Sequence, residues 1–221
     1  MAYQLMPNHW HLVLQPTEDG GMSNFLRWVA LTHTMRLHAH RGTGGQGHVY
    51  QGRFKSFPIQ DDDHFLVVCR YVERNALRAD LVRRAEDWRW GSLNRWLHKP
   101  EREPHLLSPW PLARPPRWVE RVNQPLTGAE LSAVRTSVNR GTPFGDDTWV
   151  QHIARQLNLQ STLRPRGRPK KESCHLFSPR PGCSSCRCGL RHPRGSGDRL
   201  QDDPQAAVMG CRSHVRIHND R

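Results

Sequence analysis

The order of strand-like and helix-like segments in the N-terminal third of the chain constrains its fold most. Residues 3–14 (YQLMPNHWHLVL) predict a strand, which is apolar and β-prone after a break at Pro7-Asn8. Residues 22–40 carry apolar side chains at roughly helical spacing, with Ser23 as a candidate N-cap. Residues 49–59 predict a second strand. Residues 61–74 predict a second long helix that opens with three Asp residues, where the helix dipole favours negative charge. Strands and long helices are therefore expected to alternate.

The remainder of the chain is less regular. A tryptophan-rich segment at 88–96 is expected to pack over the core, residues 98–126 are rich in proline, and residues 128–138 and 146–157 predict two further helices. After Leu163 the composition turns to Arg, Pro, Gly, Ser and Cys, which is typical of disorder. We predict three parts: a first domain at 1–97, a proline-rich connection with C-terminal helices at 98–162, and a basic, Cys-containing disordered tail at 163–221.

The charge balance indicates a polyanionic partner. Lys and Arg total 33 against 20 Asp and Glu, a formal net charge of +13. Most of the excess is arginine, whose planar guanidinium suits phosphate, so nucleic acid is the favoured partner. No apolar run is long enough to span a bilayer, and the N-terminus has no signal-peptide pattern. Five of the six Cys residues lie after position 170, which favours a reducing cytoplasm over a disulfide framework.

Two histidines separated by one residue are the first candidate site. Residues two apart in a strand point to the same face, so His9 and His11 would project side by side while Trp10 points the other way, into the core. Two neutral imidazoles at this spacing are able to share one divalent metal ion. Taken alone, the pair is also what an ordinary surface or core strand contains.

A tyrosine and an asparagine four residues apart form the second candidate site. Tyr71 and Asn75 lie in RYVERNALRADLV, and positions i and i+4 share one face of a helix. The phenol is a possible nucleophile, and the amide oxygen is a possible metal ligand. Packing for the tyrosine and C-capping for the asparagine are the ordinary alternatives.

Several motifs in register resemble one known family. LMPNHWHLVLQP, GHVYQGRFKSFPI, RYVERNALRADLV and WRWGSLNRWL are similar, in the same order, to segments of the REP-associated tyrosine transposases, which belong to the HUH single-tyrosine superfamily. The stretches NRGTPFGDDTWV and STLRPRGRPKK extend the resemblance to about residue 171. The family usually has a strand and a helix before the first of these motifs and a proline where Ala76 stands. Without that first strand, a sheet edge is expected to be exposed.

The resemblance implies a fold, a site and a substrate. It implies an α+β, ferredoxin-like antiparallel sheet backed by helices. His9, His11 and Asn75 would hold Mg²⁺ or Mn²⁺, and Tyr71 would be the nucleophile. The substrate would be single-stranded DNA with a hairpin, such as a REP-like palindrome, cleaved and rejoined through a 5′-phosphotyrosine. The protein would act in the cytoplasm, associated with the nucleoid when bound to DNA, as a monomer or a homodimer.

Basic residues near these motifs and in the tail are the candidate DNA contacts. Tryptophans 10, 28, 88 and 90 are candidates for stacking on bases, although core packing is the commoner role. The predicted phosphate contacts are Arg53, Lys55, Arg70, Arg74, Arg78, Arg164, Arg166, Arg168, Lys170 and Lys171.

Two other functions stay open at this point. One is an inactive, truncated DNA-binding remnant, and the other is a metal-dependent phosphodiesterase in which the histidines activate water and Tyr71 has no role. In the tail, Cys183, Cys186 and Cys188 are a weak zinc candidate because no second pair of ligands is well placed.

Overall fold

A computed structural model describes residues 1–50, 53–98, 106–164 and 206–212 of the chain. Two compact units are distinguished: Met1–Leu163 with Pro204–Arg221, and Arg164–Asp203. Apart from Arg164, the second unit lies outside the described residues, as does the zinc candidate in the tail. The predicted parts 1–97 and 98–162 fall together in the first unit.

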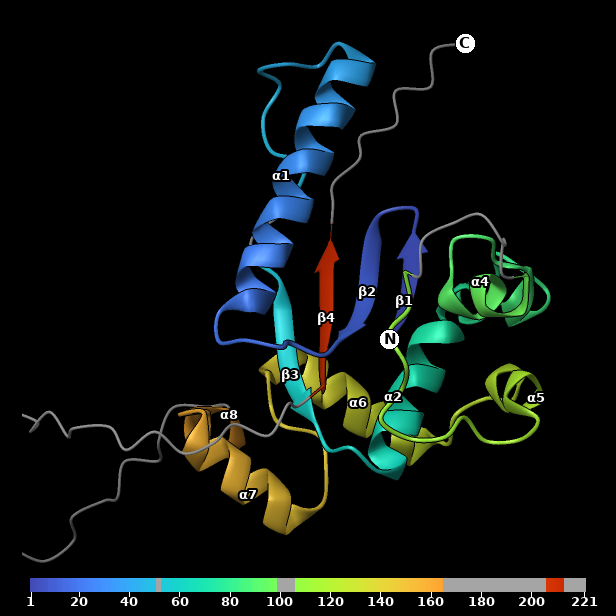
Figure 1. Ribbon diagram of the computed structural model, residues 1–221, viewed down its shortest axis with the longest axis vertical. Helices are drawn as coiled ribbons and strands as arrows, with labels where there is room; N and C mark the ends of the chain where they lie inside the picture. Colours follow the sequence, from blue (N-terminus) through green and yellow to red (C-terminus); the bar gives the residue numbers. More distant parts are fainter. Residues whose placement is uncertain (51–52, 99–105, 165–205, 213–221) are drawn as a thin grey trace, which may run out of the picture. The chain divides into compact units, whose positions relative to one another are not determined.

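The described strands form one antiparallel sheet in the order β1-β2-β4-β3 (Figure 1). They are β1 (Ala2–Met6), β2 (His9–Leu14), β3 (Lys55–Ile59) and β4 (Ala206–Arg212). The predicted strand over residues 3–14 is divided into two strands at the Pro7-Asn8 break. Met6 pairs with His9, so Pro7 and Asn8 form the turn of a hairpin, in keeping with the preference of both residue types for turns.

Strand β4 departs most from the sequence prediction. Its residues fall in the predicted disordered tail, yet β4 pairs with β2 along one edge and with β3 along the other. Gly210, for example, lies opposite both His11 and Lys55. A segment distant in the sequence therefore lies between β2 and β3, and β1 and β3 are the outer strands of the described sheet.

The helices follow the predicted ranges closely, with two corrections. The Ser23 cap is wrong: the first helix begins after Gly20, which has a positive φ of 74° and no capping side chain. In addition, a short helix at Trp118–Asn123 lies within the proline-rich stretch that was expected to be irregular. The helices are α1 (Gly21–Arg41), α2 (Asp63–Glu73), α3 (Asn75–Arg78), the 3-10 turn η1 (Ala85–Asp87), α4 (Ser92–His98), α5 (Trp118–Asn123), α6 (Gly128–Arg140), α7 (Asp147–Gln156) and α8 (Gln160–Leu163).

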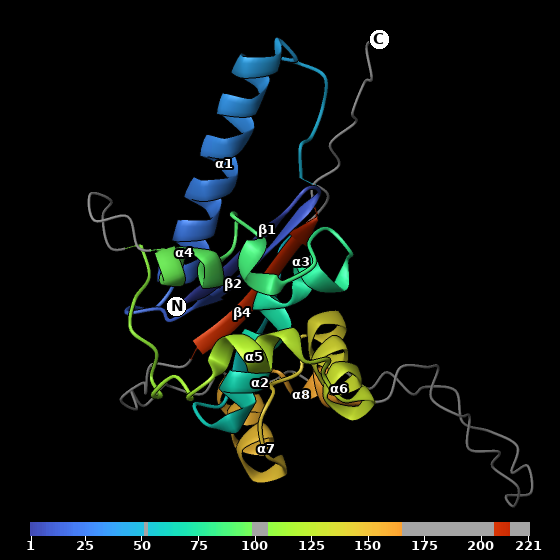
Figure 2. The same ribbon diagram turned by 90° about the vertical axis from the view of Figure 1, so that its right-hand side faces the viewer.

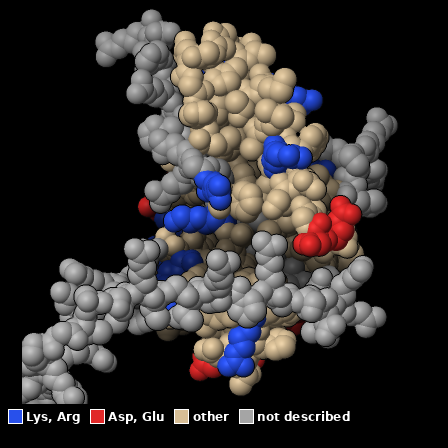
Figure 3. Space-filling view, turned by 90° about the vertical axis from the view of Figure 1, so that its left-hand side faces the viewer, with Lys and Arg blue, Asp and Glu red and all other residues tan. Residues whose placement is uncertain are grey.

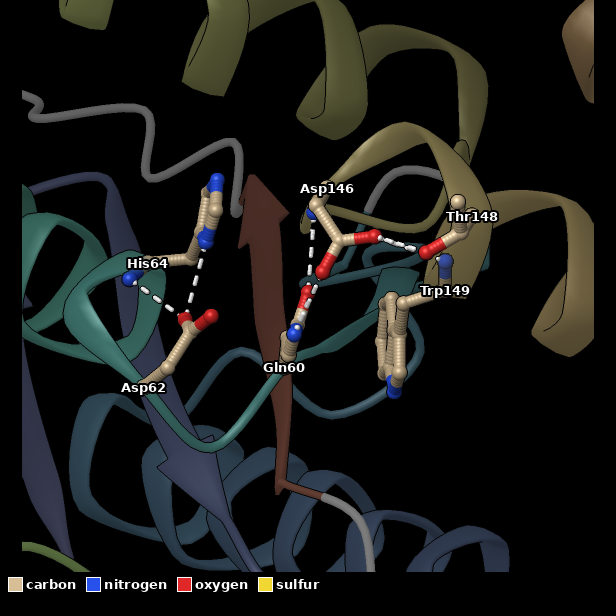
Figure 4. Close-up of polar contacts among 6 residues, drawn as sticks. All are labelled: Gln60, Asp62, His64, Asp146, Thr148 and Trp149. Carbon is tan, nitrogen blue, oxygen red and sulfur yellow. Dashed lines mark hydrogen bonds and ion pairs between the residues drawn. The ribbon is translucent and has the colours of Figure 1, made fainter.

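Side-chain caps fix the starts of α2 and α7 beside the end of β3 (Figure 4). Asp62 accepts a hydrogen bond from the backbone N–H of His64, and Asp146 accepts one from that of Trp149. Gln60, directly after β3, donates to the Asp146 carboxylate and accepts from the Asp146 backbone N–H. These contacts tie the direction of both helices to the sheet, since each satisfies backbone donors that a helix start leaves free.

The core lies between the sheet and α2. Helices α2, α4, α5 and α6 lie on one side of the strands, and α1 extends on the other (Figures 1 and 2). Val13, Phe57, Phe65, Val68 and Val72 are fully or almost fully buried in this layer. The prediction that Trp10 enters the core is wrong. Trp10 is half-buried and contacts Tyr50, on the strand face away from the buried side chains of His11 and Val13.

No helix in the described ranges is both long and apolar enough to cross a membrane.

Candidate active site

Strand β2 places the two histidines side by side, with ring centroids 5.0 Å apart. His11 is 6% exposed, whereas His9 is half-buried beside the turn. His9 Nδ1 lies 2.7 Å from the side-chain oxygen of Asn8. Because that oxygen only accepts, His9 Nδ1 donates and the ring lone pair is on Nε2. Asn8 was not among the residues predicted for the site. Its position next to His9 in the sequence was the feature that could have identified it.

Helix α2 brings Tyr71 against the histidines. The Tyr71 ring centroid lies 5.8 Å from that of His11, and Tyr71 is 6% exposed. Its neighbours Val68 and Val72 are buried in the core, which anchors this face of the helix to the sheet. The structure therefore brings together His9, His11 and Tyr71, three of the residues predicted for the site.

Asn75 and Arg78, in the short helix α3 that follows α2, lie next to Tyr71. Asn75 opens α3 directly after Arg74, which keeps a near-helical backbone (φ −82°, ψ −5°), and Asn75 is only 1% exposed. Arg78 donates a hydrogen bond to Asn75 Oδ1. The Arg78 guanidinium carbon also lies 5.1 Å from the centroid of the Tyr71 ring. Asn75 is thus linked to Tyr71 through Arg78.

Burial keeps His11 neutral. Burial, with smaller contributions from His9 and Arg78, lowers the pKa of His11 from 6.5 to about 3. Its Nδ1 and the Asn75 side-chain nitrogen are buried and have no hydrogen-bond partner among the described residues. Such orphaned polar atoms are uncommon in protein interiors and call for an explanation.

The donor set fits a divalent metal ion. Imidazole nitrogens bind first-row transition metals, and a carboxamide oxygen suits Mg²⁺ and Mn²⁺. His9, His11 and Asn75 supply these donors, and the unpartnered Nδ1 of His11 is an atom that a metal would satisfy. No cluster of three or more His, Cys, Asp or Glu side chains suitable for a metal is found in the described ranges. The candidate centre differs from such clusters in using an amide as its third donor.

Arg70 and Arg74, two of the predicted phosphate contacts, direct their guanidiniums to backbone carbonyls. Arg70 is 8% exposed and donates to the backbone oxygens of Gln124 and Pro125. Arg74 donates to those of Val122 and Asn123. Both guanidiniums therefore satisfy backbone groups at the end of α5. The sequence did not reveal this role because it did not reveal α5.

The remaining residues predicted to contact DNA differ in their exposure. Arg53 and Lys55 are exposed near the start of β3, and Lys and Arg outnumber acidic side chains on the face in Figure 3. Trp28 and Trp90 are 63% and 49% exposed, whereas Trp88 donates to the Leu5 carbonyl. Arg164 ends the third described range, and its predicted partners Arg166, Arg168, Lys170 and Lys171 lie outside the described residues.

Comparison with known proteins gives one family. Residues 1–75 match the model of the family described as transposase, IS200-like. No curated protein and no solved structure matches the chain. The matched segment contains the β1–β2 hairpin, the two histidines, Tyr71 and Asn75. Over residues 1–75 this chain is therefore similar to the IS200-like transposases.

Proposed function

We propose that this protein is a single-tyrosine DNA strand transferase, in which Tyr71 attacks a phosphodiester beside a divalent metal held by His9, His11 and Asn75. The match to IS200-like transposases supports a transposase-like, DNA-acting function in general. The finer proposal depends chiefly on one observation: the Tyr71 ring lies 5.8 Å from that of His11, which lies 5.0 Å from that of His9.

The chemistry is a transesterification. Tyr71 Oη forms a bond to phosphorus as the bond from phosphorus to the 3′-oxygen breaks. The phenol gives up its proton, the departing 3′-oxygen gains one, and the product is a 5′-phosphotyrosine with a free 3′-OH. Attack by a different 3′-OH reverses the step and rejoins strands, so no nucleotide cofactor is needed.

Each residue of the site has a separate task. The buried contacts of α2 hold the Tyr71 ring against His11, and Asn8 sets the tautomer of His9 so that Nε2 carries the lone pair. His11 keeps an unprotonated imidazole because it is buried. A bound Mg²⁺ or Mn²⁺ would supply Lewis-acid polarisation of a phosphate oxygen.

The proposed substrate is single-stranded DNA with a hairpin, such as a REP-like palindrome. The net charge of +13 supports a polyanionic partner, and the exposed Arg53 and Lys55 are proposed phosphate contacts. The basic stretch around Arg164, Arg166, Arg168, Lys170 and Lys171 is proposed as a further contact.

Incubation with Mn²⁺ and a hairpin-bearing oligonucleotide tests the proposal. We expect a covalent protein–DNA adduct that survives denaturing electrophoresis and is lost in Tyr71→Phe, while that variant still binds the oligonucleotide. Tyr50→Phe is the matched control, because Tyr50 is aromatic and packs against Trp10 instead of His11. It should form adduct at the wild-type rate.

The other outcomes separate the competing functions. Adduct that persists in Tyr71→Phe would show that the nucleophile is wrongly assigned. Strand cleavage without adduct would indicate hydrolysis by activated water. Binding with neither cleavage nor adduct would indicate a non-catalytic remnant.

A further inference from the structure

Arg78 contacts both sides of the candidate site. Its guanidinium carbon lies 5.1 Å from the centroid of the Tyr71 ring, and its Nη2 donates a hydrogen bond to Asn75 Oδ1. The proposed nucleophile and the proposed amide ligand are therefore both in contact with one cation.

The neighbouring arginines show that this placement is specific. Arg70 and Arg74 direct their guanidiniums to backbone carbonyls near the end of α5. Arg78 has no such backbone acceptor among the described residues. It is exposed, and its hydrogen bond goes to Asn75. Because Arg78 is exposed and makes one side-chain hydrogen bond, its guanidinium can move away at a lower free-energy cost than those of Arg70 and Arg74.

Asn75 Oδ1 is the atom in question, because it is the oxygen that a divalent ion would bind. Asn75 is 1% exposed and its side-chain nitrogen has no partner among the described residues, so the Arg78 bond is what holds the carboxamide. A guanidinium and a divalent cation close to the same oxygen repel each other as like charges, most strongly where water is excluded. The two are therefore expected to compete.

We propose that Arg78 is a further residue of the reaction centre: it holds the Asn75 carboxamide oxygen when no divalent ion is bound, yields it when one binds, and then contacts the scissile phosphate. A guanidinium released beside the Tyr71 ring stays close to the nucleophile, and its planar fork matches two phosphate oxygens. This inference rests on the proposed function. The alternative is that Arg78 has no role in the reaction and contacts Asn75 and Tyr71 only because all three residues lie on one helical face.

Mn²⁺ affinity, measured by titration calorimetry on the full chain, tests the competition without relying on catalysis. Arg78→Gln removes the charge, and we expect it to bind Mn²⁺ about 5- to 10-fold more tightly than the wild type. Arg78→Lys keeps the charge without the planar fork and should stay near the wild-type affinity. Arg36→Gln removes one charge from exposed α1 and should change nothing. Thermal unfolding of each variant verifies that the protein is folded.

The phosphate contact is tested by the adduct assay. Arg78→Gln should form adduct at least 10-fold more slowly at saturating Mn²⁺, with Arg78→Lys in between. Unchanged or weaker Mn²⁺ binding in folded Arg78→Gln, or adduct formation at the wild-type rate, would overturn the role of Arg78. The proposed function is tested separately by His11→Ala, which should abolish Mn²⁺ binding. If the wild type binds Mn²⁺ and His11→Ala does not, the metal site stands even where the role of Arg78 fails. A wild-type chain that binds no Mn²⁺ would overturn both proposals.

Discussion

A buried acid next to Tyr71 fixes the helix that carries it. Glu73 is fully buried, and its two carboxyl oxygens accept hydrogen bonds of 2.7 Å from Ser92 Oγ and Trp118 Nε1. Ser92 begins α4 and Trp118 begins α5, so one side chain joins three helices. Because these hydrogen bonds lie two residues from Tyr71, they also limit rotation of the helix face that points at His11.

Glu73→Ala is expected to destabilise the protein by about 2–4 kcal/mol, because it leaves the Ser92 hydroxyl and the Trp118 N–H buried without acceptors. Glu73→Gln keeps the shape and one acceptor oxygen, while its amide can donate to Ser92. It should cost clearly less than Ala. Urea unfolding at constant pH measures both. Equal losses of stability for Ala and Gln would contradict this account of the network.

The same pair of variants has an expected pH dependence. Burial raises the pKa of the Glu73 carboxyl above 4.5, although hydrogen bonds from Trp118 and Ser92 and the charge of Arg114 oppose the shift. The folded state then holds a proton that the unfolded state has released. The contribution of this bound proton to the stability of the folded state is complete below pH 4.5 and is lost as pH rises through the folded-state pKa of Glu73. Glu73→Gln should therefore gain stability relative to the wild type as pH rises from 4 to 8. A constant difference would contradict the buried, proton-binding carboxyl.

Which residues of the candidate site share a face could be predicted from the sequence, because those relations are local. The alternation of a strand puts His9 and His11 on one face, and one turn of helix relates Tyr71 to Asn75. That Tyr71 meets His11 follows from packing between distant segments, and only the family resemblance anticipated it. The burial of Glu73 was not predictable, since a charged residue in a helix is usually exposed.

At the scale of elements, β4 is the feature on which the sheet depends most. It is hydrogen-bonded on both sides, so it is the link between the β1–β2 hairpin and β3. Val208 lies opposite both Val13 and Phe57, in the middle of the strand. Interruption of this backbone should separate the histidine strand from β3.

Val208→Pro is therefore expected to destabilise the protein by about 3 kcal/mol or more, because proline cannot donate to a sheet ladder and is poorly tolerated in an inner strand. Val208→Ile is the matched control and should behave like the wild type. Hydrogen exchange should show reduced protection in β2 and β3 of the proline variant. Unchanged protection and stability would mean that β4 does not complete the sheet in solution.

Elements with strong local signals were predictable. The α6 range follows from Thr127 and Glu130, which form a reciprocal cap, and α7 follows from the Asp146 cap. Strand β4 was not predictable, because its partners lie almost the whole chain length away and its flanking sequence is polar. The short α5 follows a pair of prolines and has too few residues to show a helical period.

The charge of the whole molecule sets how it should respond to salt. With a net charge of +13, the affinity for single-stranded DNA should fall linearly on logarithmic axes as salt rises. Alanine at all five of Arg164, Arg166, Arg168, Lys170 and Lys171 should reduce the slope by up to about 3.5, at about 0.7 for each phosphate that is no longer neutralised. Fluorescence anisotropy at a series of salt concentrations measures the slope. An unchanged slope would exclude this stretch from the DNA interface.

The central claim is that Tyr71 becomes covalently joined to DNA, and mass spectrometry of the adduct tests it most directly. After nuclease and trypsin digestion, the nucleotide mass should be found on the peptide Tyr71–Arg74, attached to the tyrosine. The same mass on a peptide containing Tyr3 or Tyr50, or cleaved DNA with no modified peptide, would contradict the assignment of Tyr71 as the nucleophile.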